Sequence, residues 1–137
     1  MGPNVTTYPA TGLQALTTYS FRVLAFNTFG NSAYSNTASA TTPGAPPAAP
    51  SNLTAVAVSR SQVNLTWGDN AGNESGFKIQ RSTSGGAFTL IATVGPNVTS
   101  YSNTGLQAGT KYRYRVRAYN AFGNSSFSNK AAAKTPP

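Results

Sequence analysis

Apolar and polar residues alternate with a period of two along most of the chain after residue 50. From there on, short runs rich in β-branched and aromatic residues are separated by Gly, Asn and Ser, a pattern typical of strands and turns. The runs that we expect to form strands are residues 52–58, 62–68, 76–82, 87–94, 98–101, 110–120 and 127–134. Seven strands within about 87 residues predict an all-β fold, a sandwich of two sheets.

The same alternation predicts which side chains face the interior of the sandwich. The inward positions are Val63, Leu65, Trp67, Phe77, Ile79, Tyr112, Tyr114, Val116 and Ala118. The positions between them are expected to face water: Asn64, Thr66, Lys78, Arg113, Arg115 and Arg117. A hairpin at Ser84, Gly85 and Gly86 is expected to join the third and fourth strands.

The beginning of the chain repeats its end. Residues 2–43 match residues 95–136 at 27 of 42 positions without a gap, which is the signature of an array of similar units. Between the copies lies the stretch GAPPAAP, whose prolines favour a short, semi-rigid linker. We therefore predict a partial unit over residues 1–43, a linker over 44–50 and a complete domain over 51–137.

The complete copy resembles the fibronectin type III family, in the form common in bacterial secreted and surface proteins. The resemblance is carried by APSNLTAVAV, VNLTW, DNAGNESGFKIQRS and GLQAGTKYRYRVRAYNAFGNSSFSN, and covers residues 50–136. It implies an immunoglobulin-like β-sandwich. It also implies a tyrosine corner at Leu106 and Tyr112, in which the phenol bonds back to the chain, with Leu13 and Tyr19 as the matching pair in the first copy.

In this register the first copy holds only the last three strands of such a domain. Half a sandwich exposes one apolar face, here Tyr19, Phe21 and Val23, together with unpaired strand edges. Leu24 and Phe26 are expected to face outward on the other side and could also mark a contact between subunits. Two explanations stay open: two such halves pack across a two-fold axis, or, as we favour, the chain is an excerpt of a longer polypeptide that supplies the missing strands.

Composition narrows the possible chemistry. The chain of 137 residues contains no Cys and no His, so thiol nucleophiles, disulfides and the usual transition-metal ligands are excluded. The only acidic side chains, Asp69 and Glu74, share one loop, where they are more typical of turn capping than of a Ca²⁺ site or a glycosidase pair. We therefore expect no enzymatic activity, no metal and no cofactor.

The net charge of +8 favours anionic partners. Cationic side chains alternate along the predicted sixth strand, with one more on a neighbouring strand, and form the candidate polyanion-binding stripe of Lys78, Lys111, Arg113, Arg115 and Arg117. Cations on an outer sheet face also serve solubility and discourage edge pairing. The partners that we expect are adjacent repeats of the same or identical chains, and an anionic polysaccharide or cell-surface glycan, without specific nucleic-acid binding or membrane insertion.

These features together indicate a non-catalytic spacer or fibre segment from a tandem array in a secreted or surface protein. Its location is expected to be extracellular or on the cell surface, with the signal peptide outside this chain. The alternative is an adhesive or carbohydrate-binding accessory module of a secreted enzyme, because the family accompanies polysaccharide-degrading enzymes. A filament-forming subunit is a further possibility.

Overall fold

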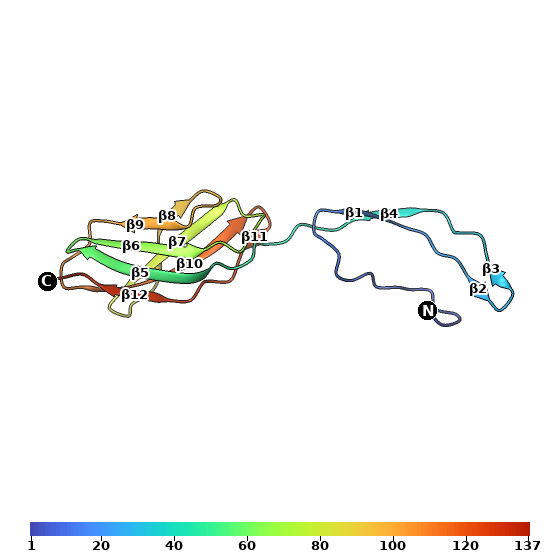
Figure 1. Ribbon diagram of the computed structural model, residues 1–137, viewed down its shortest axis with the longest axis horizontal. Helices are drawn as coiled ribbons and strands as arrows, with labels where there is room; N and C mark the ends of the chain where they lie inside the picture. The colour runs from blue at the N-terminus through green and yellow to red at the C-terminus, as the bar shows by residue number, and fades with distance from the viewer. The chain divides into compact units, whose positions relative to one another are not determined.

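The computed structural model describes residues 1–137 and divides into two compact units, Met1–Ala45 (unit 1) and Pro46–Pro137 (unit 2), each described separately below. All regular elements are strands (Figure 1). No helix long and apolar enough to span a membrane is present.

Unit 2 contains two sheets. The smaller sheet has the order β5-β6-β9 and consists of β5 (Ser51–Ser59), β6 (Gln62–Gly68) and β9 (Ser100–Asn103). All its pairings are antiparallel, with Leu65 of β6 opposite Ala55 on one side and Tyr101 on the other. Val63, Leu65 and Trp67 therefore share one face of the central strand, as the alternation predicts.

The larger sheet has the order β11-β10-β7-β8, with β12 also paired to β10 (Figure 1). Its strands are β7 (Gly76–Thr83), β8 (Thr89–Val94), β10 (Lys111–Asn120), β11 (Gly123–Asn124) and β12 (Ala131–Lys134). The central pair, β7 and β10, is in register over eight residue pairs.

The last strand differs from the expected single run over residues 127–134, because its ladder is interrupted between β11 and β12. In this interval Ser125 and Ser128 each occupy both hydrogen-bonding groups of a β10 residue. The backbone amides of the two serines donate to the carbonyls of Ala118 and Val116 (2.9 and 2.8 Å), and their Oγ atoms accept from the amides of the same residues (2.9 and 3.0 Å). The hydroxyls thus replace backbone carbonyls, and the edge stays attached to β10 without a regular ladder.

The two sheets enclose one core. All nine residues predicted to face inward are buried, with Leu53 and Leu106 in addition. Seven of the nine have no exposed surface: Val63, Leu65, Phe77, Ile79, Tyr114, Val116 and Ala118. Trp67 and Phe77 join the sheets through a tilted ring contact with centroids 5.7 Å apart. The predicted β-sandwich is therefore confirmed.

The tyrosine corner is formed as the resemblance implies. The Tyr112 hydroxyl accepts a hydrogen bond from the backbone amide of Gln107 at 3.0 Å, directly after the buried Leu106. Thr135 adds a second tie, because its hydroxyl donates to the Gln107 carbonyl at 2.6 Å. These bonds fix the chain segment that leads into β10.

A buried polar group lies at the edge of this core. Asn103 Oδ1 accepts hydrogen bonds from the Tyr114 hydroxyl at 3.0 Å and from the Arg81 guanidinium at 3.1 Å. Tyr114 has no exposed surface, and burial raises its pKa from 10.0 to about 12, against the opposing effect of the Arg81 charge. The phenol therefore stays protonated in the folded state where it would ionise in the unfolded chain.

This pKa predicts alkaline destabilisation. Because the folded state holds the Tyr114 proton more tightly, its contribution to stability is complete below pH 10 and declines as the pH rises from about 10 to about 12. Urea unfolding across that range should show this decline. In Tyr114→Phe the decline should be shallower, since the buried phenol with the raised pKa is absent; an identical slope would contradict the assignment.

Unit 1 forms the same local structure as the end of unit 2. Its strands are β1 (Thr18–Phe21), β2 (Phe26–Asn27), β3 (Gly30–Asn31) and β4 (Ala38–Thr41), with β1 paired to β4 and β2 to β3. Its tyrosine corner is also present, because the Gln14 amide donates to the Tyr19 hydroxyl at 3.0 Å.

The strand equivalent to β10 is broken in unit 1. Residues 18–27 correspond to β10, yet only β1 and β2 are strands, and the four residues between them lack a strand partner equivalent to β7. Amides in this gap are held by serine hydroxyls, as in unit 2, with Val23 donating to Ser35 Oγ and Ala25 to Ser32 Oγ. The break in unit 1 therefore accompanies both the absence of a strand equivalent to β7 and substitutions at five of the ten β10 positions.

Candidate functional surface

The outer face of the larger sheet in unit 2 carries the predicted cationic stripe. Antiparallel pairing places Arg117 opposite Lys78, Arg115 opposite Gln80 and Arg113 opposite Ser82. Residues opposite one another in a sheet point to the same side. The stripe thus forms one face, but its five members have different surroundings.

The Arg115 side chain makes its contacts within unit 2. Its guanidinium carbon lies 3.8 Å from the centre of the Phe127 ring and 4.4 Å from that of Phe88, and its Nε donates to Gln80 Oε1 at 2.8 Å. Such cation–π contacts are worth about 0.5–1 kcal/mol each at exposed sites. The half-buried guanidinium therefore acts as a packing group between two rings.

Arg117 and Lys78 are also engaged. The Arg117 guanidinium carbon lies 4.8 Å from the centre of the Phe127 ring, and its Nε is buried. Lys78 lies 4.7 Å from the centre of the Tyr119 ring and donates to Asn124 Oδ1 at 3.0 Å. The expectation that Lys78, Arg115 and Arg117 face water is therefore corrected: all three are half-buried against aromatic rings.

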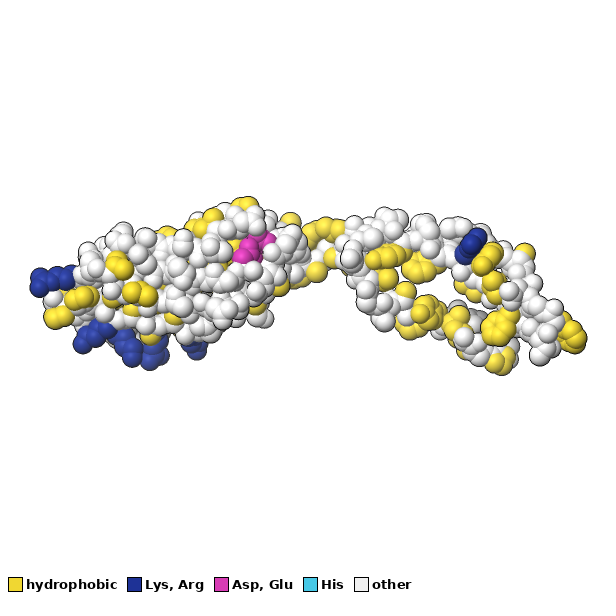
Figure 2. Space-filling model, viewed as in Figure 1, with side chains coloured by type: hydrophobic (Ala, Val, Ile, Leu, Met, Phe, Trp, Pro, Cys, Tyr) yellow, Lys and Arg dark blue, Asp and Glu magenta, His cyan; other side chains and the backbone are white.

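Lys111 and Arg113 are the exposed part of the stripe. The register of β10 and β12 adds a cation that sequence reasoning did not place here, because Lys134 lies directly opposite Lys111 and is also exposed. Figure 2 shows dark blue side chains at the end of unit 2 where the chain ends and along one side of this unit, with the magenta acids toward its other end. We call Lys111, Arg113 and Lys134 the cationic patch.

The two acidic side chains take part in loop structure. Asp69 Oδ1 accepts the amide of Ala71 at 3.0 Å, which caps a turn, and Glu74 Oε1 accepts the amide of Asn97 at 3.1 Å. The two carboxylates thus bind different backbone groups, and no group of three or more possible acidic metal ligands is formed. Neither carboxylate is paired with the cationic patch.

The candidate contact residues of unit 1 lie mostly at its surface. Phe21, Val23 and Phe26 are 40, 59 and 71% exposed, whereas Tyr19 is half-buried. Leu24 is half-buried as well, which corrects the expectation of an exposed pair with Phe26. The positions in unit 2 that match Phe21 and Val23, namely Tyr114 and Val116, have no exposed surface.

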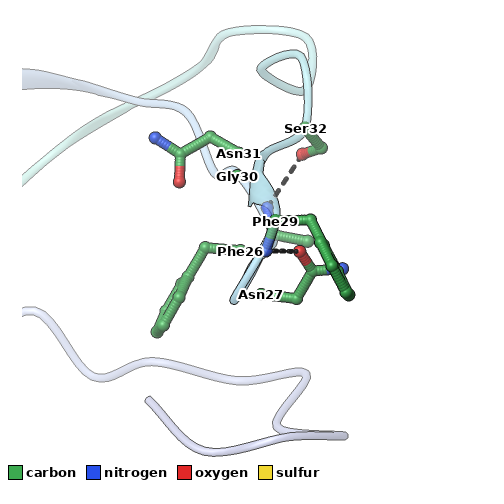
Figure 3. Close-up of a pocket in the computed structure, with 7 residues that line it drawn as sticks. Phe26, Asn27, Phe29, Gly30, Asn31 and Ser32 are labelled. Carbon is green, nitrogen blue, oxygen red and sulfur yellow. Dashed lines mark hydrogen bonds between the residues drawn. The ribbon is translucent and has the colours of Figure 1, made fainter.

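A shallow hollow lies beside the β2–β3 turn of unit 1. Figure 3 shows Phe26 and Phe29 on opposite sides of this turn, with Asn27 Oδ1 accepting the amide of Phe29 at 2.8 Å. The same bond recurs in unit 2 between Asn120 and the amide of Phe122. The hollow therefore follows from hairpin geometry that both copies share.

Sequence reasoning missed three features of this surface. It did not identify Phe88 and Phe127 as the rings that cover the arginines, nor Arg81 as the inward cation bound to Asn103, nor Lys134 as the partner of Lys111. Lys134 could have been found by pairing the last two strands as a hairpin. The ring contacts had no comparable signal, because the sequence predicts Phe88 and Phe127 within strands 87–94 and 127–134, whereas the structure has both in the loops before β8 and β12.

Comparison with known proteins agrees with this architecture. The model of the family described as "Fibronectin type III domain" matches residues 48–134. Among curated proteins, the chain is 43% identical over 93 residues to an "Alpha-amylase" of Niallia circulans, covering 66% of this chain and 7% of that protein. It is 36% identical over 141 residues to "Chitinase A1" of the same organism, covering 95% of this chain and 19% of that protein.

A solved structure gives the same result. The "Fn3-like protein from Clostridium thermocellum" is 38% identical, with a TM-score of 0.56, and the match covers 66% of this chain and 95% of that one. The chain spans less than a fifth of the length of the two curated relatives named above. From the sandwich, its tyrosine corner and the match over residues 48–134, the chain belongs to the fibronectin type III domain family.

Proposed function

We propose that the chain is a non-catalytic structural module of a tandem fibronectin type III array, serving as a spacer in a secreted or cell-surface protein. The observation that carries this proposal is the hydrogen-bond set that both copies share at a period of 93 residues. Tyrosine corner, serine hydroxyls and turn amides recur with distances equal to within about 0.1 Å. What is repeated is thus the framework, whereas outward residues such as Thr18 and Lys111 differ.

The linker supports a spacer role because its end is fixed to unit 2. Pro47 and Pro50 are buried, and Asn70 Nδ2 donates to the Ala49 carbonyl at 2.9 Å. Pro46 lies so close to Gly123 that an added Cβ there would come within 3.3 Å of its ring. A proline linker with an anchored end leaves few free residues between modules, which suits a semi-rigid spacer.

The array also accounts for the exposed apolar face of unit 1. In unit 2 the matching face is covered by the β5-β6-β9 sheet and extended by β7. Strands with the pattern of residues 51–103, from an adjacent repeat of the same or an identical chain, would cover Phe21 and Val23 in the same way. The hydrophobic effect favours this arrangement, since each such side chain contributes about 1.5–3 kcal/mol when fully buried.

The relatives favour an extracellular location and supply the alternative function. Their printed names include an amylase, a chitinase, "Exoglucanase B" and "Netrin receptor DCC". A module that accompanies enzymes acting on polysaccharides could itself hold such a substrate. The described pockets of unit 1 offer little for this, because they are lined mainly by apolar side chains and turn backbone.

Retention on insoluble polysaccharides separates the two functions. As a spacer, the 137-residue chain should pass through chitin, cellulose and starch columns at physiological ionic strength without delay. Retention that persists in high salt would favour the carbohydrate-binding alternative and count against a purely structural role. Retention that disappears in high salt would instead report attraction by net charge alone.

A further inference from the structure

The two copies carry different side chains at the start of a pair of strands that both contain, β1 with β4 in unit 1 and β10 with β12 in unit 2. In unit 1, Thr18 lies opposite Thr41 and Ser20 opposite Ser39, and each pair is joined by a hydroxyl–hydroxyl hydrogen bond of 2.8 Å. These neutral pairs satisfy one another at the surface and stabilise the pairing of β1 with β4. The fold therefore needs no charge at these positions.

Unit 2 places like charges at the same positions. Lys111 takes the place of Thr18 and Lys134 that of Thr41, so two exposed lysines occupy directly opposite positions of paired strands, with Arg113 two residues along the same face. Like charges in this arrangement oppose the pairing of the strands. Both acidic side chains of the molecule are bound to loop amides elsewhere, so neither offsets the repulsion.

We propose that the cationic patch binds an acidic polysaccharide, one that carries carboxylate or sulfate groups at regular intervals. Alternate residues of a strand are about 6.6 Å apart, so Lys111 and Arg113 can each meet a separate anionic group, while Lys134 shares the first with Lys111. A bound anion converts the repulsion between the two lysines into charge-assisted hydrogen bonds. This inference does not depend on the spacer function.

The surroundings of the patch favour a polysaccharide over a single-stranded nucleic acid. Nonspecific binding of single strands combines cations with exposed aromatic rings on which bases stack. On this face the Phe127 ring is occupied by Arg115 and Arg117, and Phe88 by Arg115, so these rings are not free for stacking. The cationic patch itself therefore consists of charged side chains without a free ring, which suits a polymer of acidic sugars.

The test is the binding of a heparin hexasaccharide to the full chain. Binding is measured by NMR titration and by calorimetry at physiological ionic strength. Backbone amides of residues 111–113 and 132–134 should shift on addition of the oligosaccharide. The double variant Lys111→Thr/Lys134→Thr, which restores the residues of unit 1, should weaken binding about tenfold. Its thermal midpoint should stay the same or rise, because the repulsion between the lysines is removed.

The matched control is Arg22→Ser/Arg60→Ser, which also lowers the net charge from +8 to +6 but removes exposed cations outside the patch. It should change affinity by no more than about twofold. Equal losses in both double variants would show attraction by net charge alone and overturn the proposal. So would the absence of binding, or tighter binding of an oligothymidylate of matched charge.

Discussion

Replacing Phe77 with alanine should lower the free energy of unfolding of unit 2 by about 3–5 kcal/mol. Phe77 has no exposed surface, comes from the centre of the larger sheet and contacts Trp67 of the other sheet. Its removal leaves a cavity between the sheets that the paired strands β7 and β10 cannot close without losing their register. A domain of this size has a free energy of unfolding of about 5–15 kcal/mol in total, so this loss is a large fraction of its stability.

The measurement is urea unfolding followed by the fluorescence of Trp67, the only tryptophan, which reports on unit 2 alone. Phe29→Ala provides the matched control, since Phe29 is 97% exposed and the change should cost less than about 0.5 kcal/mol. A loss below about 1 kcal/mol for Phe77→Ala would mean that the two sheets do not share a close-packed core.

Adding the first strands of unit 2 in front of unit 1 should stabilise unit 1. A chain in which a copy of residues 46–94 directly precedes residue 2 recreates the period of 93 residues and supplies a partner for each face and edge that β1 and β2 leave open. The free energy of opening at the amides of Val23 and Ala25, measured by hydrogen exchange, should rise from near zero to about 5 kcal/mol. The amides of Val116 and Ala118 in unit 2 provide the internal standard.

The substitution Phe21→Asp in the same extended chain tests whether the protection of unit 1 comes from specific packing or only from the added length. Phe21 matches Tyr114, which is fully buried, so a carboxylate there should abolish the gain in protection. In the chain without the extension, the same substitution should change little, because Phe21 is 40% exposed. If Val23 and Ala25 exchange as fast with the extension as without it, strands of this pattern are not the partner of unit 1.

The strand positions and the inward face of each strand followed from the sequence because both are local properties. Val63, Leu65 and Trp67 alternate with polar residues, and a strand turns each successive side chain to the opposite face whatever its neighbours are. The tyrosine corner and the repeat could also be predicted from the sequence, since each depends on a fixed spacing of residues along the chain.

Features that depend on contacts between strands were not determined by alternation. Arg115 and Arg117 have the outward parity of solvent-exposed residues, yet Phe127 and Phe88 reach over them from loops. Lys134 joins Lys111 only through the register of β10 and β12. The exposed cationic patch therefore differs from the stripe that parity predicts.

Comparing the two copies distinguishes the effect of local sequence from the effect of contacts between strands. Residues 111–120 form a continuous β10 in unit 2, whereas the matching residues 18–27, identical at five of ten positions, form two short strands in unit 1. The tyrosine corner and the serine bonds are kept in both. Local sequence thus accounts for the hydrogen bonds that both copies share and for the side to which each strand residue points. Whether this side is buried, as at Tyr114 and Val116, or exposed, as at Phe21 and Val23, depends on the fold around it, because burial requires a second sheet at the right distance.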